Sequence, residues 1–181
     1  MRRVWRLANA LPESLVQRWS RQLIGIFGIA LQVSGPHHAG GAVVANHVSW
    51  IDVFVLNAVS PCRFVAKSEV RSWPAIGWLS ARAGTLYIAR QRRGDLVAAN
   101  ATIAGHLAAG ERLALFPEGT SGPQGSVLPF HANLIQAAVS AGASASGSPL
   151  GTRLPSGFTT RVRTLRGATA ATSVLARLRR R

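Results

Sequence analysis

Strand-like and helix-like stretches alternate through the central part of the sequence, and this alternation constrains the fold more than any other feature. Short apolar runs are typical of buried strands, and the segments between and after them are typical of helices. The strand-like runs are residues 42–45, 62–66, 85–89 and 112–116, and the helix-like segments are residues 50–59, 74–82, 95–109 and 130–141. Elements that alternate at this spacing predict an α/β fold with a mostly parallel sheet flanked by helices.

Polar residues that follow these strands should lie near one another. Sites in parallel α/β sheets gather at the carboxyl ends of the strands. His47, Arg90 and residues 117–120 each follow a predicted strand. We therefore expect these three segments to converge at one edge of the sheet.

A histidine and a carboxylate stand at the exit of the first of these strands. On one regular helix, residues spaced like His47 and Asp52 point about 140° apart, because each step turns ~100°. The two can meet only if the chain turns between them, which predicts His47 on a loop and Asp52 in the first turn of a helix. Asp52 could then hold one imidazole nitrogen while the other takes a proton from a hydroxyl. The spacing alone leaves open a helix-capping histidine beside an unrelated aspartate.

Residues 1–35 are predicted to form an amphipathic helical segment on a membrane surface. Apolar residues recur at helical spacing between Leu15 and Ala30, while arginines near Trp5 and Trp19 suit anionic lipid. The apolar run at residues 23–31 is shorter than the ~20 residues needed to span a bilayer. Arginines interrupt any signal-peptide core, so no cleaved signal is expected. The alternative is an ordinary amphipathic helix packed on the domain.

The basic charge of the chain is unevenly distributed. The net charge of +15 comes from 21 basic and 6 acidic residues, and such a surface attracts anionic lipid, nucleic acid or an anionic substrate. No acidic residue follows Glu118. Residues 143–181 are basic and of low complexity, which resembles a flexible linker more than a core. We interpret them either as a truncated or frame-shifted C-terminus or as a native tail that binds anionic lipid.

Three motifs together resemble the blocks of the glycerolipid acyltransferases, over roughly residues 40–142. The first block, N-H-x-x-x-x-D, is matched by residues 46–52. The second, G-x-x-F-I-x-R, resembles residues 84–90, with Tyr87 in place of Phe and Ala89 where a polar residue is common. The third, F-P-E-G-T-S, matches residues 116–121 at every position. The resemblance places an acyltransferase domain at residues 36–142, between the N-terminal segment and the tail.

The resemblance implies transfer of a fatty acyl group from an acyl thioester to the hydroxyl of a lysophospholipid. His47 would act as general base, oriented by Asp52, and the hydroxyl oxygen would attack the thioester carbonyl directly. Acyl-CoA or acylated acyl carrier protein (acyl-ACP) would be the co-substrate, with no other cofactor and no metal, since the histidines lack zinc-type spacing. The implied substrate-binding residues are Asn46, Gly84, Arg90, Phe116, Pro117, Glu118, Gly119, Thr120 and Ser121.

The favoured acceptor is 1-acyl-sn-glycerol-3-phosphate, which would give phosphatidic acid in phospholipid biosynthesis. The guanidinium of Arg90 suits its phosphate, and Glu118 would pair with Arg90 or with a substrate hydroxyl. Another lysolipid, such as lyso-ornithine lipid, and an inactive truncated homologue are the alternatives. The expected location is peripheral or monotopic, on the cytoplasmic face of the cell membrane.

Two other function classes compete with this interpretation. A Ser/His hydrolase needs a nucleophilic serine, and no G-x-S-x-G motif is present, although Ser49 lies near His47. A nucleic-acid-binding module could use the arginines of the tail, but aromatic residues do not alternate with them and no recognition motif occurs, so no nucleic-acid partner is expected. The single cysteine, Cys62, excludes an internal disulfide and fits a reducing compartment.

Overall fold

The computed structural model describes residues 11–34, 41–89, 92–123, 126–140, 162–165 and 173–178. The helices are α1 (Glu13–Ile26), α2 (Ile51–Val59), the 3-10 helix η1 (Ser68–Ser72), α3 (Ile76–Arg82), α4 (Arg93–Ala108) and α5 (Ala132–Ser140). The strands are β1 (Ile29–Ser34), β2 (Gly41–Ala45), β3 (Arg63–Lys67), β4 (Leu86–Ile88), β5 (Arg112–Leu115), β6 (Val162–Leu165) and β7 (Ser173–Leu178).

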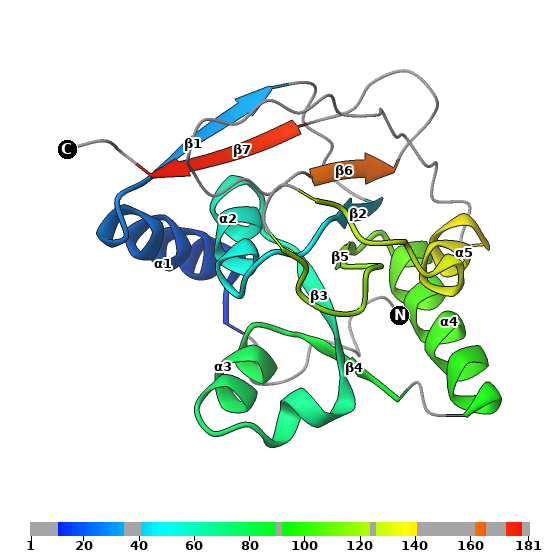
Figure 1. Cartoon of the computed structure of the whole chain (residues 1–181). Coiled ribbons are helices and arrows are strands. Elements are labelled where there is room, and N and C mark those ends of the chain that lie inside the picture. Colours follow the sequence, from blue (N-terminus) through cyan, green and yellow to red (C-terminus); the bar gives the residue numbers. More distant parts are fainter. Residues whose placement is uncertain are drawn as a thin grey trace.

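The central sheet has the strand order β4-β3-β5-β2-β6. Strands β2, β5, β3 and β4 are parallel, and β6 adds to β2 in the antiparallel sense. Helices α4 and α5 lie together at one end of the view in Figure 1, and α1 and α2 lie together at the other. This arrangement confirms the predicted α/β fold with a mostly parallel sheet between helices.

Both faces of the sheet are buried, which explains why the strands read as continuous apolar runs. Successive side chains of β2 point to opposite faces. Ala42 and Val44 join a core cluster with Ile103 of α4, whereas Val43 joins a second cluster with Val55 of α2. The sheet is therefore held from two sides, and its carboxyl edge is the part left to carry polar chemistry.

Helix α1 packs against α2 and supplies polar groups to its carboxyl end. The last carbonyls of a helix lack partners within the helix and carry partial negative charge. The side-chain amide of Gln17 donates to the carbonyls of Ala58 and Val59 at 3.3 and 3.1 Å, and Nε of Arg21 donates to the Ala58 carbonyl at 2.8 Å. This face of α1 is therefore packed on the domain, as the alternative of an ordinary amphipathic helix predicted.

The predicted apolar segment after α1 is not one helix. Helix α1 ends at Ile26, and Gly28 adopts a φ of 67°, a left-handed conformation that favours glycine. The chain then reverses into β1, which pairs antiparallel with β7. The helical spacing of apolar residues up to Ala30 therefore predicted too long a helix, because a turn at Gly28 separates α1 from β1.

Two parts of the basic tail form strands rather than linker. Strand β6 pairs with β2, so that Val162 lies opposite Ala45, and β7 pairs with β1 along its whole length. Strand pairing uses backbone N–H and C=O groups, which an unpaired strand edge offers to any extended segment. These strands therefore form without the alternating pattern by which a strand is recognised in a sequence. The predicted division at residues 35 and 142 stays a prediction.

Candidate active site

His47 and Asp52 meet at the carboxyl end of β2. The chain leaves the sheet after Ala45, and α2 begins at Ile51, so His47 lies on the connection and Asp52 in the first turn of the helix. Nδ1 of His47 lies 3.0 Å from Oδ2 of Asp52. The turn that their spacing required is therefore present.

Asp52 is fully buried and held by backbone groups. Its Oδ2 accepts the N–H groups of Val48 and Ser49 at 2.7 and 2.9 Å, in addition to its contact with the imidazole. A carboxylate is also favoured at the amino end of a helix. Asp52 thus fixes the loop and the ring together. Oγ of Ser49 accepts the N–H of Ile51 at 3.2 Å, so the serine side chain stabilises the turn at the start of α2.

The imidazole of His47 is stacked on Phe116, the residue that follows β5. Their ring centroids are 4.2 Å apart and the planes differ by 24°. Phe116 is in turn stacked on Phe64 of β3, with centroids 5.8 Å apart. When Nδ1 carries the proton shared with Asp52, Nε2 is the basic nitrogen of the neutral ring. The side chain of His47 keeps 20% of its surface exposed. The ring is therefore packed against Phe116 but still accessible from solvent.

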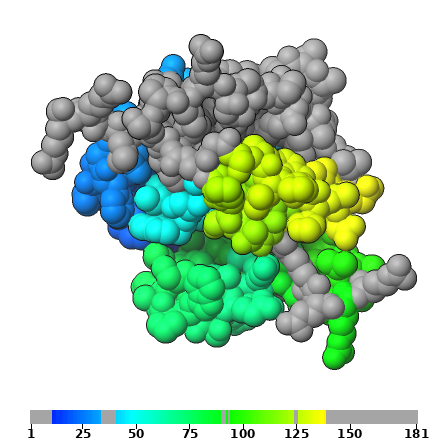
Figure 2. Space-filling model, viewed as in Figure 1, coloured from blue at the N-terminus to red at the C-terminus, as the bar shows by residue number. Residues whose placement is uncertain are grey.

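Glu118 is buried, and both of its carboxylate oxygens bind backbone N–H groups. Oε2 accepts the N–H of His47 at 2.5 Å, and Oε1 accepts the N–H of Leu128 at 2.8 Å. The N–H of Gly122 donates to the carbonyl of His47 at 2.7 Å, so the same loop binds His47 on both sides of its Cα. Figure 2 shows this yellow-green loop beside the cyan segment that contains α2, on one face of the molecule. Both oxygens therefore have backbone partners, and a pairing of Glu118 with Arg90 or with a substrate hydroxyl stays a prediction.

The rest of the third motif divides into a buried and an exposed part. Pro117 is fully buried, and its carbonyl accepts the N–H of His131 at 2.9 Å. Gly119 turns the chain with a φ of 70°. Thr120 and Ser121 are exposed, so their hydroxyls lie on the surface beside the histidine loop. This turn is the part of the motif that can reach an anionic group in solvent.

Two predicted site residues are not placed with the others. Gly84 was expected to bind substrate, but it precedes β4 and faces Arg63 at the start of the parallel strand β3, at the edge opposite His47. Its φ of 77° explains the glycine, since it turns the chain after α3. Arg90 lies outside the described residues. Asn46 is buried at the end of β2, next to His47.

Sequence reasoning missed an aromatic cluster that joins α1 to the helix carrying Asp52. Trp50 lies edge-on to Phe27 and to Phe54, each with centroids 5.7 Å apart, and Phe54 lies edge-on to Trp19 at 5.3 Å. Trp50 and Phe27 are 55% and 42% exposed. The apolar residues that follow His47 in the sequence were the available signal. The cluster presents an apolar surface beside the histidine.

Within the described residues, no helix is long and apolar enough to cross a membrane. The same part of the chain holds no group of three or more His, Cys, Asp or Glu residues suited to a metal ion.

Comparisons with known proteins agree with this geometry. The profile of the family described as Acyltransferase matches residues 31–150. The 1-acyl-sn-glycerol-3-phosphate acyltransferase of Neisseria meningitidis is 40% identical over 138 residues, which cover 73% of this chain and 54% of the relative. The lyso-ornithine lipid O-acyltransferase of Pseudomonas aeruginosa is 40% identical over 133 residues, 73% of this chain and 51% of the relative. The chain therefore spans about half the length of these relatives.

A solved structure shares the fold. The crystal structure of the 1-acyl-sn-glycerophosphate (LPA) acyltransferase PlsC from Thermotoga maritima aligns with a TM-score of 0.56 at 25% identity. The alignment covers 72% of this chain and 54% of that one. The family match at residues 31–150 contains β2, β3, β4 and β5 and the residues that surround His47.

Proposed function

Because this chain belongs to the acyltransferase family, we propose that it transfers a fatty acyl group from an acyl thioester to the hydroxyl of a lysolipid. One observation carries the proposal. Nδ1 of His47 lies 3.0 Å from the buried carboxylate of Asp52, at the carboxyl edge of a parallel sheet and against the F-P-E-G-T-S segment. This is the arrangement that a histidine needs in order to act as a positioned general base.

The reaction proceeds in two proton-balanced steps. Nε2 of His47 accepts the proton of the acceptor hydroxyl while its oxygen attacks the thioester carbonyl, and Asp52 stabilises the resulting imidazolium. The tetrahedral intermediate then collapses, the C–S bond breaks, and the imidazolium returns the proton to the departing thiolate. The product is an ester and a free thiol, without a covalent acyl-enzyme. The donor is acyl-CoA or acyl-ACP, the acylated form of acyl carrier protein.

We take 1-acyl-sn-glycerol-3-phosphate as the acceptor. The relatives from Neisseria carry that activity in their names. The exposed turn at Thr120 and Ser121 and the guanidinium of Arg90 are the groups that would bind a phosphate. Lyso-ornithine lipid is the second candidate, because four relatives, among them that of Brucella abortus at 38% identity, are named for it.

The acceptor is a membrane lipid, so the site must reach a bilayer surface. Large apolar side chains beside the site are exposed, including Trp50 at 55% and Phe27, which contacts it, at 42%. The net charge of +15 favours an anionic leaflet. These features support a peripheral or monotopic position on the cytoplasmic face of the cell membrane, with the aromatic cluster at the headgroup level.

A panel of substrates tests the proposal. The full chain is incubated with labelled acyl-CoA or acyl carrier protein and with several lysolipids, and the products are identified by mass spectrometry. We expect a new ester that depends on the thioester and is lost in His47→Ala. The matched control is His106→Ala, because His106 faces Glu111 with the same 3.0 Å contact beside the amino end of β5. Equal turnover in His47→Ala and His106→Ala would overturn the assignment.

A further inference from the structure

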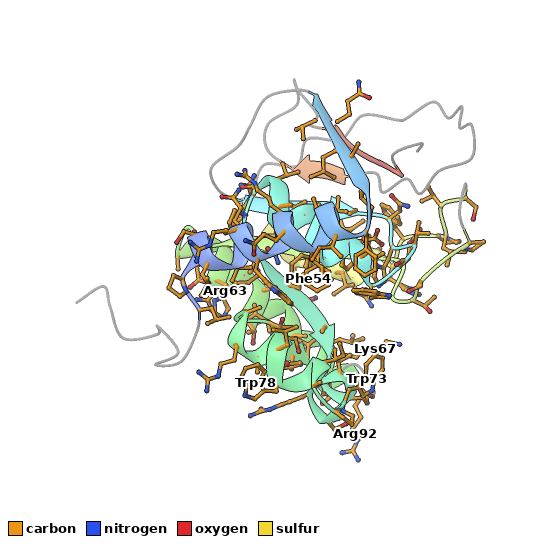
Figure 3. The ribbon with its side chains drawn as sticks, turned by 90° about the vertical axis from the view of Figure 1, so that its left-hand side faces the viewer. Phe54, Arg63, Lys67, Trp73, Trp78 and Arg92 are labelled. Carbon is orange, nitrogen blue, oxygen red and sulfur yellow. The ribbon has the colours of Figure 1, made fainter. Side chains whose placement is uncertain are left out.

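The turn between η1 and α3 exposes three large apolar side chains close together in the sequence. Trp73, Ile76 and Trp78 are 56%, 47% and 64% exposed. Figure 3 shows Trp73 and Trp78 projecting from this region, on the side of the molecule that also carries α1. Exposed apolar groups gathered in this way mark an interaction surface. The mechanism above uses none of them.

We propose that this surface docks on an anionic phospholipid membrane. We call it the α3 surface and define it by six residues. They are Lys67, Arg71, Trp73, Ile76, Trp78 and Arg82. The inference rests on the proposed function only for its biological purpose, since a lysolipid acceptor resides in a bilayer.

The backbone beneath the α3 surface is tightly braced. A Cβ added to Gly77 would lie 2.2 Å from the backbone carbonyl oxygen of Arg71, so η1 and the start of α3 approach each other as closely as a glycine permits. The hydroxyl of Tyr87 donates to the Gly77 carbonyl at 3.1 Å and lies 2.6 Å from Oγ of Ser80. Because this backbone is already ordered, it should lose little conformational entropy when the exposed side chains bind a partner.

A tight turn immediately precedes α3 within this surface. The N–H of Ile76 donates to the carbonyl of Pro74 at 2.6 Å across Ala75, which has φ 57° and ψ −50°. This is a γ-turn with positive φ at a residue other than glycine, a strained conformation of a kind that clusters at functional positions. All six residues from 71 to 76 are exposed.

The charges around the apolar groups identify the occupant. Arg82 lies over the ring of Trp78, with Cζ 5.4 Å from the centroid, and Arg71 lies 5.9 Å from that of Tyr87. Three cations and one carboxylate, Glu69, belong to this region, a net charge of +2 (3 − 1). Tryptophan beside basic side chains is the composition that binds the headgroup region of an anionic leaflet. An acidic protein would match the cations but leave three large apolar groups without a counterpart.

The test compares vesicle binding by the full chain and by two variants. Trp73→Ser/Trp78→Ser removes both indoles, and Val97→Ser is the matched control, because Val97 is an apolar residue 71% exposed on α4. Sedimentation uses vesicles of equimolar phosphatidylglycerol and phosphatidylcholine, and of phosphatidylcholine alone. We expect the double variant to bind the anionic vesicles roughly tenfold more weakly, with Val97→Ser unchanged. Circular dichroism and thermal unfolding verify that both variants are folded.

Activity on a lysolipid dispersed below its micellar concentration separates this inference from the proposed function. We expect the double variant to keep wild-type turnover there, because the α3 surface is distinct from His47. If the wild type proves inactive but the double variant still loses vesicle binding, the proposed function fails and the docking surface stands. Wild-type vesicle binding by the double variant would overturn the inference. A raised KM for acyl carrier protein with unchanged vesicle binding would assign the surface to that protein and equally refute membrane docking.

Discussion

A carboxylate oxygen of Glu118 accepts the backbone N–H of His47 at 2.5 Å, across 71 positions of the sequence. The other oxygen accepts the N–H of Leu128. Gly122, within the loop closed by this second bond, donates to the carbonyl of His47. The third motif therefore holds the backbone of His47, the proposed general base. Glu118 acts as a positioning residue, because its polar atoms face the chain itself.

Replacement of Glu118 by Gln should impair turnover more than acceptor binding. The amide keeps one oxygen acceptor, and its NH₂ group then faces a backbone N–H that it cannot accept. The loss of a buried hydrogen bond costs about 1–3 kcal/mol of folding free energy, and the histidine loop is displaced. We expect kcat to fall by about tenfold or more while the acceptor KM changes little, measured by steady-state kinetics with thermal unfolding.

The conservative variant Glu118→Asp provides the control for charge. This variant keeps the carboxylate but shortens its reach. A kcat between those of the wild type and Glu118→Gln would indicate that both the charge and the position of the carboxylate matter. A raised acceptor KM at constant kcat in both variants would instead make Glu118 a substrate ligand, contrary to its position in the structure.

Asp52→Asn should reduce kcat with little effect on the fold of the loop. The amide oxygen can still accept from Val48 and Ser49, but it no longer carries the charge that stabilises the imidazolium of His47. We expect a fall of about 100-fold or more, by analogy with carboxylates that serve catalytic histidines. Glu111→Gln is the matched control, since Glu111 faces His106 in the same way at a distant position. Similar losses in both variants would indicate general destabilisation.

Arg21→Ala should loosen α1 from α2. The guanidinium of Arg21 donates to the Ala58 carbonyl at 2.8 Å, near the carboxyl end of α2. Loss of a hydrogen bond from a cation at such a position should lower the free energy of unfolding by about 1 kcal/mol. Chemical denaturation measures it, and Arg18→Ala on the same helix is the control. Equal stability of the Arg21 variant and the wild type would show that the contact contributes nothing.

Local spacing predicted the part of the site that depends on local geometry. The helical period alone required a turn between His47 and Asp52, and the structure has that turn. Alternating apolar segments predicted the parallel sheet, because burial on two faces leaves a recognisable pattern. These inferences need no knowledge of distant contacts.

Contacts between distant backbone groups could not be predicted in this way. One of the N–H groups that bind the carboxylate of Glu118 belongs to His47. No pattern of side chains in a sequence indicates where a backbone donor points. Gly84 has a local structural reason that its place in the motif does not reveal. Its φ of 77° fits a turn that favours glycine, and its role in substrate binding stays a prediction. The strands of the tail likewise pair through backbone groups, so a composition typical of a linker concealed them.

Cys62 should resist thiol reagents and make stability depend on alkaline pH. Burial raises the pKa of its thiol from 9.0 to about 12, against a smaller opposing effect of Arg112. Between these values the unfolded chain loses the proton and the folded chain keeps it, so the unfolded state binds fewer protons and stability falls as pH rises, by up to about 1.4 kcal/mol per pH unit. We expect slow labelling of the native chain by an aromatic disulfide reagent at pH 8, because little thiolate forms there, and rapid labelling in denaturant. The free energy of unfolding, measured by denaturation between pH 9 and 11, should fall more steeply for the wild type than for Cys62→Ala, and parallel curves would contradict the raised pKa of the thiol.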